Sequence, residues 1–250
     1  MSKLTAVHKV LIIVVLVAVA GLVVNAIYRN KTGSGVGAVS LNDREKIIAD
    51  LQTFEITNTQ LDELGKERLF DSFKLQKDAL NKANQEFTKQ GGTSYAGLYW
   101  PFLNMGSLNR DAGNLKKAEE AYLFANTISP EAFVPLGDLG DLYFRYLKDY
   151  KKGAAYYEQA IAIKDNPYLE TYYSELYELY HFWIKDDARL ESLLIDGSTK
   201  HPDETNILAL LGRLYKETGR KDKAIETFQE LLFKKPDSQV AKDALAELKQ

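Results

Sequence analysis

The feature that most constrains the fold is an order of small, aromatic and proline residues that recurs every 34 to 37 residues. In the stretch LGRLYKETGRKDKAIETF, residues 211–228, Leu, Gly, Tyr, Gly, Ala and Phe stand at positions 211, 212, 215, 219, 224 and 228. The same order begins at Met105-Gly106 and at Leu139-Gly140, and a weaker copy lies around Leu176. Four of the six prolines are 37, 35 and 34 residues apart and mark the same period: Pro130, Pro167, Pro202 and Pro236. The chain is therefore predicted to be an array of similar units.

Each copy reads as two amphipathic helices, because its apolar residues recur at intervals of three and four. Small residues such as Gly140 and Gly212 allow two helices to approach closely, and large ones such as Tyr157 and Phe228 fill the space between them. Gly219 suits a tight turn that requires a positive φ. The second and third copies each carry an extra residue near this turn. No pair can cover its own apolar faces, so neighbouring pairs must stack.

The period near 34 and the order of these residues resemble the tetratricopeptide repeat. The resemblance extends over residues 95–236 in four copies, at about 99–132, 133–168, 169–203 and 204–236, of which the third is degenerate. It implies an all-α fold, an α-solenoid of tetratricopeptide helix pairs. Residues 43–90 are predicted to form a divergent N-terminal helical pair. Residues 237–250 are predicted to form a capping helix whose packed face holds Val240, Ala241, Ala244, Leu245 and Leu248.

Residues 10–28, VLIIVVLVAVAGLVVNAIY, contain no charged side chain. As a helix these residues would span about 28 Å, close to the hydrocarbon thickness of a bilayer. A cleaved signal peptide is the alternative, because Ala18-Val19-Ala20 has the form of a cleavage site, but the apolar run continues past it to Val24. We therefore expect a transmembrane signal-anchor helix after a short N-terminal tail, residues 1–9, and before a flexible Gly/Ser-rich linker, residues 29–42.

The sequence predicts a single-pass membrane protein that is located in a bacterial-type cell envelope. Basic residues flank both ends of residues 10–28, so the positive-inside rule is nearly balanced. An uncleaved signal-anchor usually keeps its N-terminus in the cytoplasm, which places the soluble domain outside the cytoplasm.

The sequence lacks the motifs of the common catalytic and metal sites. The chain contains no cysteine, and its three histidines do not have metal-ligand spacing. No nucleophile elbow and no phosphate-binding loop occur. Residues 40–250 hold 28 basic and 35 acidic side chains, a net charge of −7, which has the wrong sign for binding nucleic acid. We therefore expect no enzyme activity, no metal, no cofactor, no small-molecule substrate and no nucleic-acid partner.

The resemblance implies that a protein partner, as an extended segment or a helix, binds along the groove formed by the first helix of each repeat. Basic groove residues would hold carboxylates, and Trp100, Phe144 and Phe182 would hold apolar side chains. The arrays that clamp the C-terminal carboxylate of chaperones carry Lys and Asn where this chain has Leu103 and Ser107, so that partner class is not expected. The predicted groove residues are Trp100, Leu103, Ser107, Arg110, Asp141, Phe144, Arg145, Glu178, His181, Phe182, Arg213 and Lys216.

The sequence therefore predicts a non-catalytic, membrane-tethered scaffold or adaptor for protein–protein interactions. Two alternatives stay open: an ancillary, chaperone-like subunit associated with a translocon or an assembly machinery, and a structural protein that forms homo-oligomers through residues 43–90. Ten of the 15 tyrosines lie between Tyr143 and Tyr180. Five of them exceed what the repeat needs for packing, and their role, packing or recognition, is left open: Tyr146, Tyr156, Tyr168, Tyr172 and Tyr173.

Overall fold

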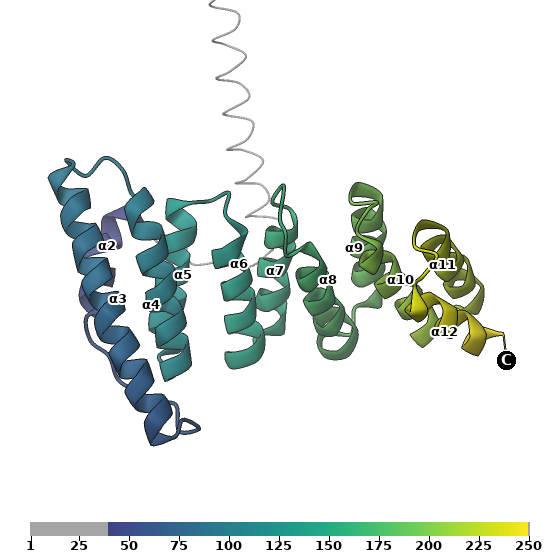
Figure 1. The fold of residues 1–250 in the computed structure, drawn as a ribbon, viewed down its shortest axis with the longest axis horizontal. Helices are drawn as coiled ribbons and strands as arrows, with labels where there is room; N and C mark the ends of the chain where they lie inside the picture. The colour runs from purple at the N-terminus through teal and green to yellow at the C-terminus, as the bar shows by residue number, and fades with distance from the viewer. Residues whose placement is uncertain (1–39, 250) are drawn as a thin grey trace, which may run out of the picture. The chain divides into compact units, whose positions relative to one another are not determined.

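The computed structural model describes residues 40–249, and within that range helices are the only regular secondary structure (Figure 1). Eleven α-helices follow one another in a row, which confirms the predicted all-α class. Their bounds are α2 Arg44–Leu51, α3 Glu63–Lys89, α4 Tyr99–Ala112, α5 Leu115–Ile128, α6 Phe133–Asp141, α7 Tyr150–Ile161, α8 Leu169–Tyr177, α9 Asp187–Lys200, α10 Thr205–Glu217, α11 Lys221–Lys234 and α12 Gln239–Leu248.

The predicted tail and membrane span, residues 1–28, lie outside the described residues. None of the helices within residues 40–249 is long and apolar enough to cross a membrane. The predicted linker extended to residue 42, but a 3₁₀-helix, η1 Leu41–Asp43, already begins at Leu41. The Ser40 hydroxyl accepts a hydrogen bond from the Asn42 amide, and the Asp43 carboxylate accepts one from the Ser40 amide, so a capping box closes the N-terminus of this helix.

Three of the four repeats are held together by an aromatic ring that lies on a glycine. A Cβ atom on Gly106 of α4 would lie 2.6 Å from the Tyr122 ring of α5, and one on Gly140 of α6 would lie 2.7 Å from the Tyr157 ring of α7. Gly212 of α10 has the same relation to Phe228 of α11, at 2.9 Å. These distances leave no room for any side chain at the glycine positions.

The third repeat reverses this contact. Tyr177 and Leu194 occupy the positions that hold the glycine and the aromatic ring elsewhere. Here the glycine is Gly197 on the second helix, α9, and a Cβ atom on it would lie 2.5 Å from the hydroxyl oxygen of Tyr173 on the first helix, α8. The degenerate sequence of this repeat therefore comes from an exchange of small and large partners across the same helix pair.

In repeats two and three the extra residue is accommodated by a π-helical segment at the end of the first helix. These segments are η3, Leu142–Tyr146, and η4, Glu178–Ile184. In repeat one the turn is closed by the Asn114 amide bonding to the carbonyl five residues earlier, whereas the Asp149 and Asp186 amides reach carbonyls six residues earlier. The prediction of an inserted residue at this turn is confirmed.

The turns with and without the inserted residue also differ in the type of residue that has the left-handed conformation. In repeats one and four it is glycine, with φ of 89° at Gly113 and 74° at Gly219. In repeats two and three it is lysine, with φ of 58° at Lys148 and 62° at Lys185. A side chain with a Cβ is strained in this region of φ, so these two turns store local strain.

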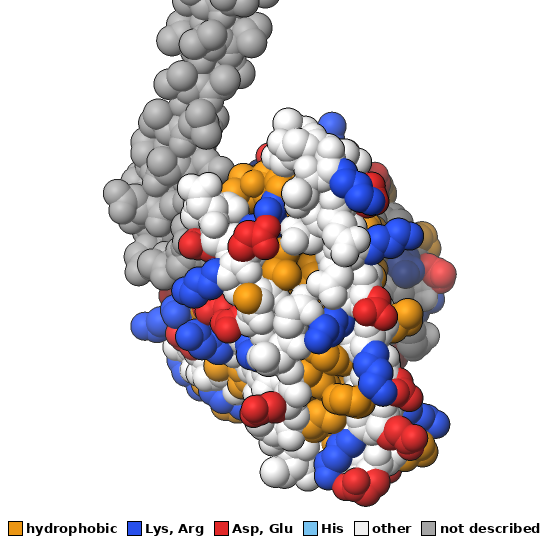
Figure 2. Space-filling model, turned by 90° about the vertical axis from the view of Figure 1, so that its left-hand side faces the viewer, with side chains coloured by type: hydrophobic (Ala, Val, Ile, Leu, Met, Phe, Trp, Pro, Cys, Tyr) orange, Lys and Arg blue, Asp and Glu red, His pale blue; other side chains and the backbone are white. Residues whose placement is uncertain are grey.

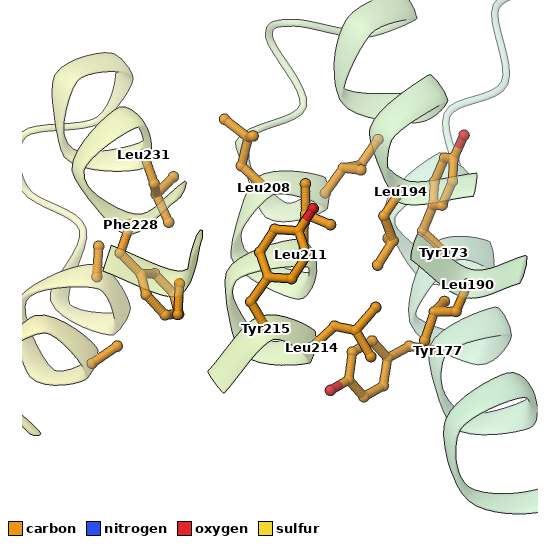
Figure 3. Packing of buried hydrophobic residues seen from close by; sticks show 14 of the residues in the cluster. Tyr173, Tyr177, Leu190, Leu194, Leu208, Leu211, Leu214, Tyr215, Phe228 and Leu231 are labelled. Atoms are coloured by element: carbon orange, nitrogen blue, oxygen red, sulfur yellow. The ribbon is translucent and has the colours of Figure 1, made fainter. Parts of the chain in front are cut away.

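In the C-terminal part of the array, from α8 to α12, one apolar core cluster runs from one helix pair to the next, as stacking requires (Figure 3). Leu190 and Leu194 of α9 meet Leu208, Leu211 and Leu214 of α10 in one cluster. The cluster continues through α11 to α12, where Ala241, Ala244 and Leu245 are buried as predicted for the cap. Val240 was predicted on the same face, but its side chain is exposed because it points to the neighbouring groove.

Helices α2 and α3 occupy the segment for which an N-terminal helical pair was predicted, and α3 packs against α4. The segment between them is fixed to the first repeat, because the amides of Thr57 and Asn58 both donate to the Ala112 carbonyl, at 2.8 and 2.9 Å. The Lys117 ammonium donates to the Thr53 carbonyl. These contacts make the pair continuous with the array.

Candidate protein-binding groove

The first helices of the repeats are α4, α6, α8 and α10, of which α6 and α8 continue into η3 and η4. The surface that these six segments form is here called the A-helix face. Ion pairs and hydrogen bonds join each of these helices to the next. Between α8, α10 and α12 this face is hollowed into a groove of about 430 Å³. The groove is lined by Glu170, Ser174, Asn206, Ala209, Leu210, Arg213, Lys216, Glu217, Phe228, Val240, Asp243, Ala244 and Glu247.

The groove is lined by apolar side chains, here called its floor, and by charged side chains, here called its rim. Ala209 and Leu210 come from the middle of α10, and Val240 and Ala244 come from α12. Glu170 stands in the first turn of α8 and Asp243 in the middle of α12. A short apolar floor between charged rims is suited to a polypeptide segment with an apolar side chain flanked by polar ones.

Two predicted groove cations belong to the C-terminal half, and both are bound to carboxylates of this chain. The Nε atom of Arg213 lies 2.8 Å from Oε1 of Glu217, and its guanidinium carbon lies 4.8 Å from the centre of the Tyr177 ring. The Nζ atom of Lys216 lies 2.6 Å from Oε2 of Glu247 on α12.

The other two predicted groove cations, Arg145 and Arg110, lie in the N-terminal half and are also paired with carboxylates of this chain. Arg145 contacts Asp141 on its own helix, at 3.1 Å, and Glu175 on α8, at 2.5 Å. Asp141 also accepts a hydrogen bond from the hydroxyl of Tyr157, at 2.7 Å. The four cations were predicted to hold carboxylates of a partner, but in this structure each already holds carboxylates of neighbouring helices.

Arg110 completes this set and links α4 to α6. Its Nε atom lies 3.0 Å from Asp111, and its Nη1 atom lies 3.9 Å from Asp138 of α6. Burial raises the pKa of Asp138 to about 6, although the nearby Arg110 opposes this shift. The pKa of Asp138 therefore lies well above the ordinary value of an aspartate.

His181 lies in a hydrogen-bonded cluster at the end of the A-helix face. Its Nδ1 is 2.6 Å from Asp187 and its Nε2 is 3.2 Å from Glu217, which also accepts a hydrogen bond from the Tyr177 hydroxyl at 2.5 Å. Burial raises the pKa of Glu217, but the hydrogen bonds from Tyr177 and Arg213 outweigh it, so that this pKa lies below its usual range. Within residues 40–249 no group of His, Asp and Glu is arranged to hold a metal ion.

The predicted apolar groove residues divide into two groups. Trp100 and Phe182 are exposed to 61% and 44% and are available to a partner. Leu103 and Phe144 are exposed to only 3% and 4%. Phe144 packs near Tyr150 and the indole of Trp183, with ring centres 6.1 and 6.5 Å apart, so it belongs to the contact between repeats two and three. Leu103 and Phe144 were both predicted to line the groove, but both side chains are buried in this structure.

The two remaining predicted residues are partly buried. Ser107 accepts a hydrogen bond from the Tyr122 hydroxyl at 3.1 Å, and Glu178 lies 3.5 Å from the indole nitrogen of Trp183. The sequence prediction missed three carboxylates of the same face: Asp138, Glu170 and Glu175. They adjoin Gly137, Thr171 and Ser174, which the repeat register also places toward the groove, so a wider helical stripe would have included them.

The surplus tyrosines divide as well. Tyr156, Tyr172 and Tyr173 are buried, and their rings fill the spaces above glycines or between helix pairs. Tyr146 and Tyr168 are exposed. Packing therefore accounts for three of the five, and only these last two have the exposure that recognition requires.

The comparisons with known proteins support the repeat assignment. Residues 136–167 and residues 188–248 each match a model described as tetratricopeptide repeat. No curated protein matches the sequence. Among solved structures, one similar chain is described as YrrB, a TPR protein with an unusual peptide-binding site. The two share 14% identity with a TM-score of 0.44, over 66% of this chain and 81% of that one.

A second similar chain comes from the APC/C hetero-tetramer Cut9–Hcn1. It shares 18% identity with a TM-score of 0.42, over 61% of this chain and 30% of the other. Both likenesses are too distant to carry an argument about function. The two sequence matches, which fall on repeats two to four, support the tetratricopeptide-repeat family for this chain.

Proposed function

We propose that this protein is a non-catalytic scaffold that binds a segment of another protein in the groove between α8, α10 and α12. The observation that carries the proposal is the groove itself, a hollow of about 430 Å³ with an apolar floor on the face that the sequence resemblance marks as a binding surface. Repeat arrays of this kind expose one extended surface and need no catalytic group to use it.

Tethering to a membrane is the second part of the proposal. It rests on the apolar, uncharged run at residues 10–28 and on the Gly-rich stretch that follows it. In this proposal the helical array stands outside the cytoplasm, on the side of the membrane opposite the N-terminus.

The groove is tested by site-specific photocrosslinking in cells. A photoreactive phenylalanine analogue replaces Val240, which is exposed and lines the groove, or Phe233, which is exposed on α11 outside it. We expect a discrete covalent adduct with another protein from position 240 and none from position 233. Equal adducts from both positions, or none from either, would contradict binding in the groove.

The tether and its orientation are tested with the same cysteine-free chain. A variant that lacks residues 1–39 should leave the membrane fraction on alkaline washing, whereas the full chain should stay. A single Lys164→Cys, at an exposed position, should react with an impermeant maleimide before cells are lysed. A reaction that requires lysis would reverse the orientation.

Self-assembly through residues 43–90 is the second candidate, because α3 exposes several large apolar side chains. Leu64, Phe70 and Leu75 are all more than two-fifths exposed. Figure 2 shows this end of the row, where apolar side chains lie in separate groups among charged ones. Light scattering decides this point: an oligomer that dissociates in Leu64→Glu/Leu75→Glu supports self-assembly, and a monomeric wild-type protein excludes it.

A further inference from the structure

The charges of the two kinds of helix in the repeats differ. The first helices with their π-helical ends, residues 99–112, 133–146, 169–184 and 205–217, contain four Lys or Arg and seven Asp or Glu. The second helices, α5, α7, α9 and α11, contain nine of each. The A-helix face is therefore acidic, with a net charge of −3, and the opposite helices are balanced.

The cations of the A-helix face are less available to a partner than its carboxylates are. Each of its four Lys and Arg side chains contacts one or more carboxylates of this chain. To bind a carboxylate of a partner, Arg213 or Lys216 must first leave Glu217 or Glu247. An acidic segment would therefore exchange one ion pair for another and would bring further negative charge to the face.

Two carboxylates that line the groove, on α8 and α12, lack such a counter-charge. Glu170 and Asp243 on the groove rim form no ion pair in the described part of the chain, and Asp243 accepts only a neutral hydrogen bond, from Gln239. Glu175, outside the groove lining, is paired with Arg145 through Oε1, but its Oε2 is buried without a hydrogen-bond partner. Burial also raises the pKa of Glu175, although Arg145 opposes the shift. Glu170 and Asp243 are therefore available as acceptors for cationic donors that residues 40–249 do not supply.

From this arrangement we infer that the groove is selective for basic segments, in which Lys or Arg side chains flank an apolar residue. The apolar residue lies on the floor made by Ala209, Leu210 and Val240, and the flanking cations face the rim carboxylates Glu170 and Asp243. This inference rests on the proposed function, because it specifies the chemistry of the segment that the same groove binds. Charge complementarity of this kind sets the choice of partner and the rate of association.

The experiment is a selection from a random 12-residue peptide library displayed on phage, with the purified full-length chain in detergent as the target. Three targets are compared. They are the wild type, the rim variant Glu170→Gln/Asp243→Asn, and the control variant Glu226→Gln/Glu230→Gln. The control removes the same two charges from exposed positions of α11 that lie outside the groove. Circular dichroism of each target confirms that the helix content is unchanged.

We expect the wild type and the control to enrich peptides in which Lys or Arg flanks Leu, Ile or Phe, and the rim variant to lose this enrichment. For one enriched peptide, the rim substitutions should raise the dissociation constant about tenfold, and the control substitutions less than twofold. Replacing the Lys or Arg residues of that peptide by Glu should abolish binding to the wild type.

The possible failures are distinguishable. If acidic or neutral peptides are enriched, and their binding is lost when the groove is blocked by Ala209→Trp, the groove binds segments but the inferred charge preference is wrong. If basic peptides bind the rim variant and the control equally, the attraction is non-specific and the inference is also wrong. If no peptide shows binding that Ala209→Trp removes, the proposed function itself fails.

Discussion

Asp138 offers a direct test of the electrostatics of the A-helix face. Its side chain is 23% exposed, and its Oδ1 lies 3.9 Å from Nη1 of Arg110. The carboxylates of Asp111 and Asp141 act on it as well and raise its pKa further. Burial is the largest cause of the shift, and the pKa reaches about 6 from an ordinary value of 3.8. The isosteric change Asp138→Asn removes the charge and keeps the size of the side chain.

The sign of the effect follows from the direction of the shift. The folded state holds the proton of Asp138 more tightly than the unfolded state, so this group stabilises the fold below about pH 4. That contribution is lost as the pH rises from about 4 to about 6. A shift of about two pKa units corresponds to about 3 kcal/mol. We therefore expect Asp138→Asn to raise the free energy of unfolding by about 1–3 kcal/mol at pH 7.5 and to change it little at pH 4.

The assay is urea denaturation of wild type and variant, followed by circular dichroism between pH 4 and pH 8. Asp141→Asn is the matched control, because Asp141 accepts bonds from Tyr157 and Arg145, so loss of its charge should destabilise the protein at pH 7.5. If Asp138→Asn lowers stability at pH 7.5, Arg110 stabilises the carboxylate. If the change raises stability equally at all pH values, the gain does not come from the titration of Asp138. Either result would refute our reasoning.

Two further predictions concern the backbone. Gly140→Ala should lower the free energy of unfolding by about 1–3 kcal/mol in thermal denaturation, because the added Cβ lies 2.7 Å from the Tyr157 ring; an unchanged melting temperature would show that the two helices can separate freely. Lys148→Gly and Lys185→Gly should each raise stability by up to about 1 kcal/mol, because glycine adopts the left-handed conformation without strain. The same change at Lys151, within α7, should lower stability by about 1 kcal/mol, so a loss at all three positions would refute the argument.

The sequence was sufficient for the helix pairs because the contact that defines a pair is local. Gly106 and Tyr122 are 16 residues apart, as are Gly212 and Phe228, so the repeating sequence pattern itself identifies the two residues that are in contact. The third repeat was harder to recognise for the same reason. Gly197 lies on the second helix of that pair, so a pattern that looks for glycine on the first helix does not find it.

The groove was less predictable, because its electrostatics depend on contacts between repeats. Repeat register indicates that Arg145 and Lys216 face outward, and the structure agrees that both are at least partly exposed. Register cannot indicate that Arg145 reaches Glu175, or that Lys216 reaches Glu247, since each pair is about 30 residues apart and depends on the rotation between neighbouring helix pairs. The cations were therefore identified correctly as surface residues, but their partners within the chain were not.

The departures from a 34-residue period explain where the open groove lies. The proline spacing of 37 includes the residue inserted at η3 and a longer segment between α7 and α8, and the spacing of 35 includes the residue inserted at η4. These insertions bring Trp183 onto Tyr150, with ring centres 4.6 Å apart, and bury Phe144 beside them. Between Pro202 and Pro236 the spacing returns to 34, and the groove lies beside this regular repeat. Packing of the inserted residues thus buries a predicted contact residue in the middle of the array, and the groove proposed as the binding site lies in the C-terminal half.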